Sequence, residues 1–152
     1  MDMSQHQFTD TETKEEIEKL LGQTDHQTAV GWAADCAEHI LKNFEDLHPQ
    51  DKRPRKAVQA CRAWVAGNLN VREARRTAFE THAAARMSGN EAAIAAARAA
   101  GQAISTAHLF SHAIHASTYA VKSVAFASGF DAQVIADERN WQRERLIELQ
   151  KK

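Results

Sequence analysis

Residues 91–127 read EAAIAAARAAGQAISTAHLFSHAIHASTYAVKSVAFA, and this stretch predicts the centre of the fold. It is rich in alanine, contains no proline and carries only three charged side chains, those of Glu91, Arg98 and Lys122. Alanine is the best helix former, and a helical segment with so little charge is not a solvated face. We therefore expect a central helical element that is buried on most sides, whose small side chains let neighbouring helices approach closely.

The same stretch is too long to be one helix in a compact protein. At a rise of ~1.5 Å per residue, a single helix over it would exceed about 50 Å. A compact chain of this length has a radius of gyration near ~15 Å, so we expect a break. Ser111 and Ser117 are the two candidates, because each serine can cap a second helix. We favour Ser117, with the first helix ending near His115 and the second running from about residue 118 to residue 127.

The rest of the chain also has helical periodicity, punctuated by short turns. We predict one all-α domain over residues 11–152, built as a compact bundle of six to seven helices around the alanine-rich centre, after a flexible N-terminus at residues 1–10. One helix is expected to run from Asp25 to about Glu45. The predicted first residues or N-caps are Thr11 or Thr13, Asp25, Arg55, Asn70, Asn90, Thr118 and Asp131.

Composition excludes several classes of protein. With 43% hydrophobic and 26% charged residues, the chain reads as globular and not disordered. A net charge of −1 argues against nonspecific nucleic-acid binding, and no apolar run is long enough to span a membrane. The acidic N-terminus does not resemble a secretory signal, and Cys36 and Cys61 fit reduced core thiols. We expect a cytoplasmic protein, a monomer or homodimer, with neither nucleic acid nor membrane as partner.

Three histidines form the sharpest candidate for chemistry. His108, His112 and His115 would lie within ~60° of one another around a continuous helix. A pair at i and i+4 can share a zinc or iron ion, with His82 or Asp35 completing the shell. This hypothesis makes the chain a metal-dependent helical-bundle enzyme that uses His108 and His112. The alternative, which we favour, is that these are neutral core histidines and that the protein needs no cofactor.

Other polar residues lie close to apolar helix faces, and no complete catalytic motif accompanies them. We interpret them as a structural polar network, because buried carboxylates and guanidiniums need partners and more often fix helix register than perform catalysis. A basic cluster at residues 52–56 is consistent with a solvated loop or with a phosphate-binding patch. The predicted network consists of Asp35, Glu38, Arg62, Arg98, His108, His112 and Glu138.

Seven short segments carry a resemblance to a known family. They are Trp32–Glu38, Arg53–Ala57 with Ala63–Trp64, His82–Arg86, Arg98–Gly101 with Thr106–His108, His112–Ala113, Tyr119–Ala120, and Glu138–Arg139 with Trp141–Gln142. Their order resembles the alanine-rich, all-helical family of immunity proteins of bacterial toxin systems, from about residue 25 to residue 146. Where this sequence has His115, the family pattern leads us to expect glycine, which favours a helix end there and weakens the three-histidine metal hypothesis.

The resemblance implies a small cytosolic antidote that binds a cognate protein toxin and blocks it. It transfers no catalytic residues to this chain. The implied mechanism is steric and electrostatic occlusion through a complementary surface. The acidic N-terminal helix and the basic loop at residues 51–56 are equal candidates for that surface.

Overall fold

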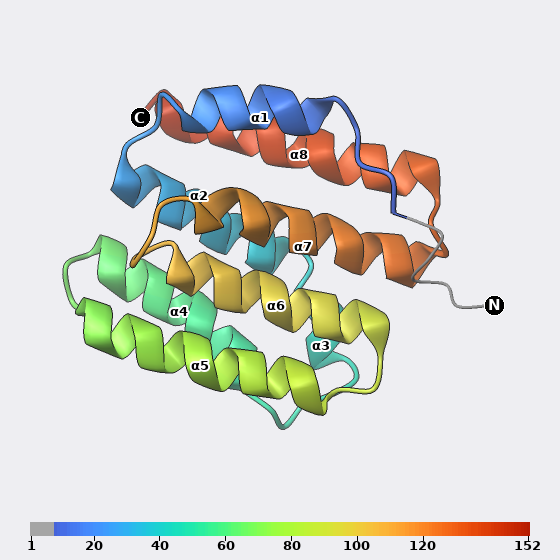
Figure 1. Cartoon of the computed structure of the whole chain (residues 1–152), viewed down its shortest axis with the longest axis horizontal. Coiled ribbons are helices and arrows are strands. Elements are labelled where there is room, and N and C mark those ends of the chain that lie inside the picture. The colour runs from blue at the N-terminus through green and yellow to red at the C-terminus, as the bar shows by residue number, and fades with distance from the viewer. Residues whose placement is uncertain (1–7) are drawn as a thin grey trace.

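The computed structural model describes residues 8–152, which form eight α-helices and no strand (Figure 1). The all-α class is confirmed, whereas the predicted number of six to seven helices is too low by one or two. Residues 1–7 of the predicted flexible N-terminus lie outside the described part of the chain. The helices are α1 (Thr13–Leu21), α2 (His26–His39), α3 (Lys42–Glu45), α4 (Arg53–Val65), α5 (Val71–Met87), α6 (Glu91–Ser105), α7 (His112–Ser128) and α8 (Ala132–Gln150).

The additional helix arises from a break in the segment that we expected to be continuous from Asp25 to Glu45. Helix α2 ends at His39, and the backbone of Ile40 leaves the helical region with φ −118° and ψ 11°. The chain then forms the short helix α3, whose Phe44 is buried. Leu41 and Phe44 are both buried after this bend.

Helix α6 lies at the centre of the bundle and packs against α2, α3, α4, α5 and α7. In Figure 1, α1 and α8 lie together at one edge of the molecule, and α4 and α5 occupy the opposite edge. One hydrophobic core receives buried residues from all eight helices. None of the helices in residues 8–152 is long and apolar enough to cross a membrane.

The core around α6 is built mainly from alanine, as the sequence predicted. Seven alanines of α6 are buried, together with Gly101 and Ile104. Side chains this small allow the helix backbones to lie close together. A few large groups fill the remaining space, and Trp32, whose indole N–H donates to the carbonyl of Gln142 at 2.8 Å, is the largest fully buried one.

The predicted break near His115 and Ser117 is wrong, because the chain turns earlier, at residues 106–111. Ser111 precedes α7 but makes no capping hydrogen bond with its side chain. His115 and Ser117 both lie inside α7. The Ser117 hydroxyl donates to the carbonyl of Ile114 at 2.7 Å and accepts from Arg139 at 2.9 Å, so it serves packing against α8 and does not begin a helix.

Most of the other predicted helix starts are confirmed by side-chain caps. Asn70, a predicted N-cap, forms a complete capping box with Glu73 at the start of α5. Neither Thr11 nor Thr13 caps α1, which has no capping bond from a side chain. Gly129 ends α7 in the left-handed region, with φ 69°, where a side chain would be strained. The side chains that accept backbone N–H groups at helix starts are those of Asp25, Asn70, Asn90 and Asp131.

Arg139 on α8 ties the N-terminal segment to the bundle. Its side chain is fully buried, and its guanidinium donates to both carboxylate oxygens of Asp10, at 2.9 and 2.6 Å. It also donates to Ser117, Thr118 and Gln142. Burial opposes ionisation of Asp10, but the hydrogen bonds and charge of Arg139 outweigh it and lower the pKa of Asp10.

Candidate functional site

The predicted polar network does not form one cluster. Asp35, Glu38, Arg62 and Glu138 lie where α2, α4 and α8 meet. The other three predicted members, Arg98, His108 and His112, lie on the α5, α6 and α7 side of the molecule and contact different partners. The predicted network therefore consists of two separate groups of residues.

Asp35 is the centre of the first group. Its carboxylate accepts from Arg62 at 2.7 Å and from Arg145 at 2.8 Å, and only 12% of its side chain is exposed. Glu38, one turn further along α2, accepts from Arg62 at 3.1 Å and from Arg55 at 2.9 Å. These contacts join α2 to α4 and α8. Every carboxylate of the group already has a basic partner, so the cluster carries little uncompensated charge.

Glu138 lies beside this cluster and has a different kind of partner. It accepts a hydrogen bond from Nδ1 of His39 at 2.8 Å, and the His39 ring stacks on Trp141 with a centroid separation of 3.6 Å. Two adjoining hollows of about 320 and 390 Å³ share His39 as a lining residue. Trp141 and Arg145 line the first, while the second continues toward Val124 on α7. Sequence reasoning did not single out His39 or Arg145, because their partners are about a hundred residues away.

On the α5, α6 and α7 side of the molecule, His82, His108 and His112 each pair with a different side chain. Nη1 of Arg98 donates to Nδ1 of His82 at 2.8 Å, and Nη2 of Arg75 donates to Nδ1 of His108 at 2.9 Å. The ring of His112 lies 2.6 Å from the amide oxygen of Gln102. These contacts hold α5 against α6, and α6 against the start of α7.

Burial and nearby positive charge favour the neutral form of two of these rings. Burial, followed by the charges of Arg98 and Arg86, lowers the pKa of His82 from 6.5 to about 4. The pKa of His112 is lowered by burial and by its neighbours His115 and His108. The structural interpretation predicted neutral core imidazoles, and the core placement is wrong for His108 and His115, which are exposed, while His112 is half-buried.

The metal hypothesis required His108, His112 and His115 to lie on one continuous helix, and they do not. His108 lies in the turn before α7, so it does not share a continuous helix with His112 and His115. Across residues 8–152, no group of three or more histidine, cysteine, aspartate or glutamate side chains is arranged to hold a metal ion. His82, the proposed additional ligand, instead faces Arg98.

The two cysteines are buried and unpaired with each other. Both Cys36 and Cys61 are fully buried free thiols. Burial raises the pKa of Cys61 to about 12 and raises that of Cys36 well above its usual value. The thiolate is the reactive form, so neither side chain is poised to act as a nucleophile.

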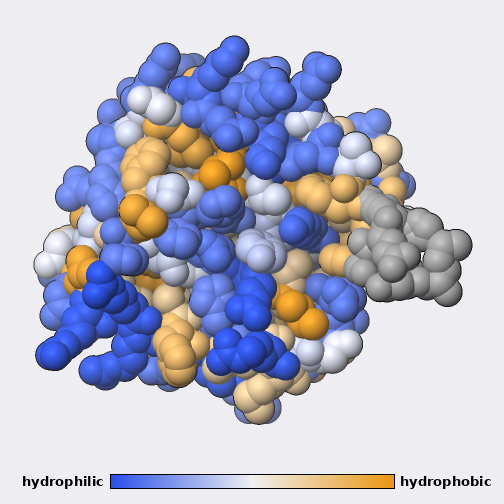
Figure 2. Space-filling model, in the orientation of Figure 1, coloured by the Kyte–Doolittle hydropathy of each residue, from blue (hydrophilic) through white to orange (hydrophobic). Residues whose placement is uncertain are grey.

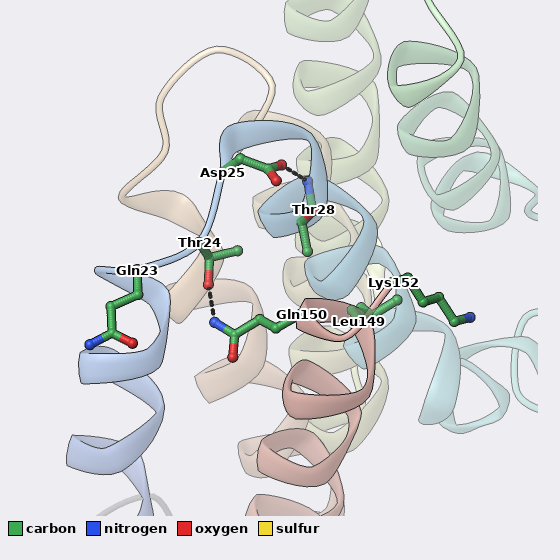
Figure 3. A pocket seen from close by; sticks show the side chains of 7 residues that line it. All are labelled: Gln23, Thr24, Asp25, Thr28, Leu149, Gln150 and Lys152. Carbon is green, nitrogen blue, oxygen red and sulfur yellow. Dashed lines mark hydrogen bonds between the residues drawn. The ribbon is translucent and has the colours of Figure 1, made fainter.

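A smaller hollow of about 190 Å³ lies between the α1–α2 turn and the end of α8 (Figure 3). In Figure 3 the amide of Gln150 points to the hydroxyl of Thr24, 2.7 Å away, and Asp25 caps α2 through the backbone N–H of Thr28. Gln150 also donates to the carbonyl of Leu20 at 3.0 Å. These polar groups fasten the C-terminus to the α1–α2 turn, which is a structural role.

The outer face of α5 is the surface that sequence reasoning missed. It displays four exposed arginines around Phe79, whose side chain is 72% exposed. We call these residues, Arg72, Arg75, Arg76, Phe79 and Arg86, the α5 arginine face. The signal was present in the sequence, because they recur at spacings of three and four residues on the side of the helix opposite Ala74, Ala78, Thr81 and Ala85, which are all buried.

Comparison with known proteins identifies a family. A family described as "Imm-5 like putative immunity protein" matches residues 19–149, which is most of the chain. No curated protein and no solved structure matches the chain significantly.

Proposed function

We propose that this chain, which belongs to the Imm-5 like family, protects against a cognate protein toxin by binding it and covering the surface on which the toxin acts. The family match over residues 19–149 is the observation that carries this proposal. It includes helices α2 to α7 in full, α8 except for its last residue, Gln150, and the end of α1. The whole bundle, and not one loop or domain, is therefore the unit to which the immunity role is assigned.

Binding, and not catalysis, is the proposed mode of action. Three observations support it. The carboxylates between α2, α4 and α8 are paired with arginines or a histidine, and the two thiols are buried. The rings of His82, His108 and His112 contact other side chains. Groups held in such contacts serve the fold. An inhibitor of this kind needs a rigid complementary surface and no turnover, and it would act in the cytoplasm as a monomer or homodimer.

Co-expression tests this function directly. Cells that express a toxin encoded beside the gene for this chain should stop growing, and co-expression of the chain should restore growth. A catalytically dead variant of the same toxin should be captured by the purified chain as a complex in size-exclusion chromatography. Failure to protect against, or bind, any neighbouring toxin, together with measurable turnover of a substrate by the chain, would reverse the assignment.

A further inference from the structure

The α5 arginine face is a continuous surface at the edge of the bundle. Its residues fall within an arc of about 100° around α5 and extend for ~21 Å along the helix. Figure 2 shows strongly hydrophilic side chains gathered over this edge of the molecule, with smaller hydrophobic areas between them. A 72% exposed phenylalanine among four exposed arginines leaves a large apolar ring uncovered in a positively charged setting.

These arginines have no carboxylate partner, a property that they share only with the partly buried Arg98 among the arginines of residues 8–152. Among residues 8–152, none of the ion pairs includes Arg72, Arg75, Arg76 or Arg86. Arg75 is bonded to a histidine ring instead. Two acidic side chains of α5, Glu73 and Glu80, lie at the margin of the arc, and Glu73 is engaged in the capping box. The face therefore has a net positive charge, which Glu73 and Glu80 offset only in part.

The part of the chain that contains the α5 arginine face is also positively charged as a whole. Residues 71–128 contain six basic and three acidic side chains and thus have a net charge of +3, while the rest of the chain has −4. The hollows beside α2 and α8 lie in the more acidic part. There, however, Asp35, Glu38 and Glu138 each have a basic or histidine partner within 3.1 Å. The carboxylates beside those hollows are therefore paired, whereas the four exposed arginines of α5 have no carboxylate partner.

We propose that the α5 arginine face is the docking surface for the toxin, which presents to it an acidic surface with an apolar recess for the ring of Phe79. This assignment rests on the proposed function. Arginine and large aromatic side chains supply much of the binding energy in protein interfaces, and guanidiniums pair with carboxylates through two parallel hydrogen bonds. The face needs no reorganisation, because the capping box and the packing of α5 against α4 and α6 hold the helix in place.

Two variants test the assignment against the toxin encoded beside the gene. We expect Phe79→Ala to lower the affinity for the toxin at least about 10-fold. We expect the double variant Arg72→Glu with Arg76→Glu to lower it about 100-fold or more. Lys14→Glu with Lys19→Glu on α1 is the matched charge control, and Leu47→Ala, at a 52% exposed residue, is the apolar control. Both controls should bind as the wild type does, and circular dichroism should show that every variant melts like the wild type.

A 20-residue poly-glutamate peptide provides a second probe that does not require the toxin. At low salt it should bind the wild type and the α1 variant but not the α5 charge variant. Tighter binding of a single-stranded oligonucleotide of equal charge would overturn the assignment of an acidic protein as partner. Equal toxin binding by the wild type and the α5 charge variant would overturn the docking surface alone. If no toxin binds the wild type, the proposed function falls and the docking surface falls with it.

Discussion

Gly101 on α6 lies directly against the imidazole of His82 on α5. A Cβ atom built at Gly101 would be 2.6 Å from Cε1 of His82, closer than real side chains approach one another. The ring is held in this place by the hydrogen bond from Arg98. This contact explains why the alanine run of α6 is interrupted by its single glycine.

The first prediction concerns this contact. Gly101→Ala should destabilise the protein by about 1–3 kcal/mol, because the added methyl group collides with the ring. In a His82→Ala background the same change should stabilise it by up to ~1 kcal/mol, because alanine is the better helix former. Urea unfolding of the four proteins in this double-mutant cycle measures both effects. An identical effect of Gly101→Ala in the two backgrounds would show that the ring is not the obstacle.

The second prediction concerns pH. The pKa of His82 is about 4 in the folded protein and 6.5 in the unfolded chain. The neutral ring therefore stabilises the fold fully above pH 6.5, and this contribution is lost as the pH falls from there toward 4. Because the ring is partly exposed, we expect a loss of only ~1–2 kcal/mol.

A His82→Gln variant isolates that contribution, because glutamine keeps an acceptor for Arg98 but does not titrate. The free energy of unfolding should be measured at about pH 7 and about pH 4.5 for both proteins. The wild type should lose more stability between the two conditions, since all other groups titrate equally in both proteins. Parallel losses would mean that His82 has an ordinary pKa.

Helix starts could be predicted from the sequence because their causes are local. Asn70, Asn90 and Asp131 each accept a backbone N–H within three residues, so the sequence around each site contains the whole interaction. The break in the alanine-rich stretch was misplaced for the opposite reason. Ser117 is a good cap in isolation, but in the fold its hydroxyl accepts from Arg139, which is 22 residues away on α8.

The candidate site was predictable only in part. The sequence identified charged residues that need partners but could not assign those partners. For example, Asp35 accepts a hydrogen bond from Arg145, which is 110 residues away in the sequence. The same limit applies to α5. Its arginine spacing is visible in the sequence, but the sequence does not show whether that side of the helix meets another helix or solvent.

The third prediction concerns the buried pair of Asp10 and Arg139. Asp10→Ala should cost about 3 kcal/mol of stability, because it leaves a buried guanidinium without its counter-charge. Adding Arg139→Met should recover part of that loss by removing the unpaired charge. Thermal unfolding of the two variants measures this. If the single variant were as stable as the wild type, the N-terminal segment would not hold this pair in solution.

The same reasoning applies to truncation. A chain shortened to the matched residues 19–149 would lack Asp10 while retaining Arg139. We expect it to be less stable than the full chain by more than Asp10→Ala alone costs, because the cut also removes the buried Ile17 of α1, and we expect Arg139→Met to reduce the difference. Equal stability of the shortened and full chains would contradict this prediction.

The fourth prediction addresses metal binding. We expect no stoichiometric metal in untagged protein and no large gain in melting temperature with added zinc, since Arg75 already donates to Nδ1 of His108 and His112 lies against Gln102. A bound metal would stabilise the fold by several kcal/mol at saturation. Elemental analysis is the measurement. About one zinc, iron or nickel per chain, lost in His112→Ala, would favour a metalloenzyme over an immunity protein.

The alanine-built interior has an evolutionary consequence. A buried methyl group such as that of Ala96 or Ala100 offers little volume to lose, and close packing leaves no space for a larger side chain. We therefore expect sequence change to be tolerated mainly on the outer sides of the helices, where substitutions scarcely disturb the interior. If the α5 arginine face is the proposed docking surface, its side chains could be exchanged to fit a different partner while the alanine interior stays unchanged.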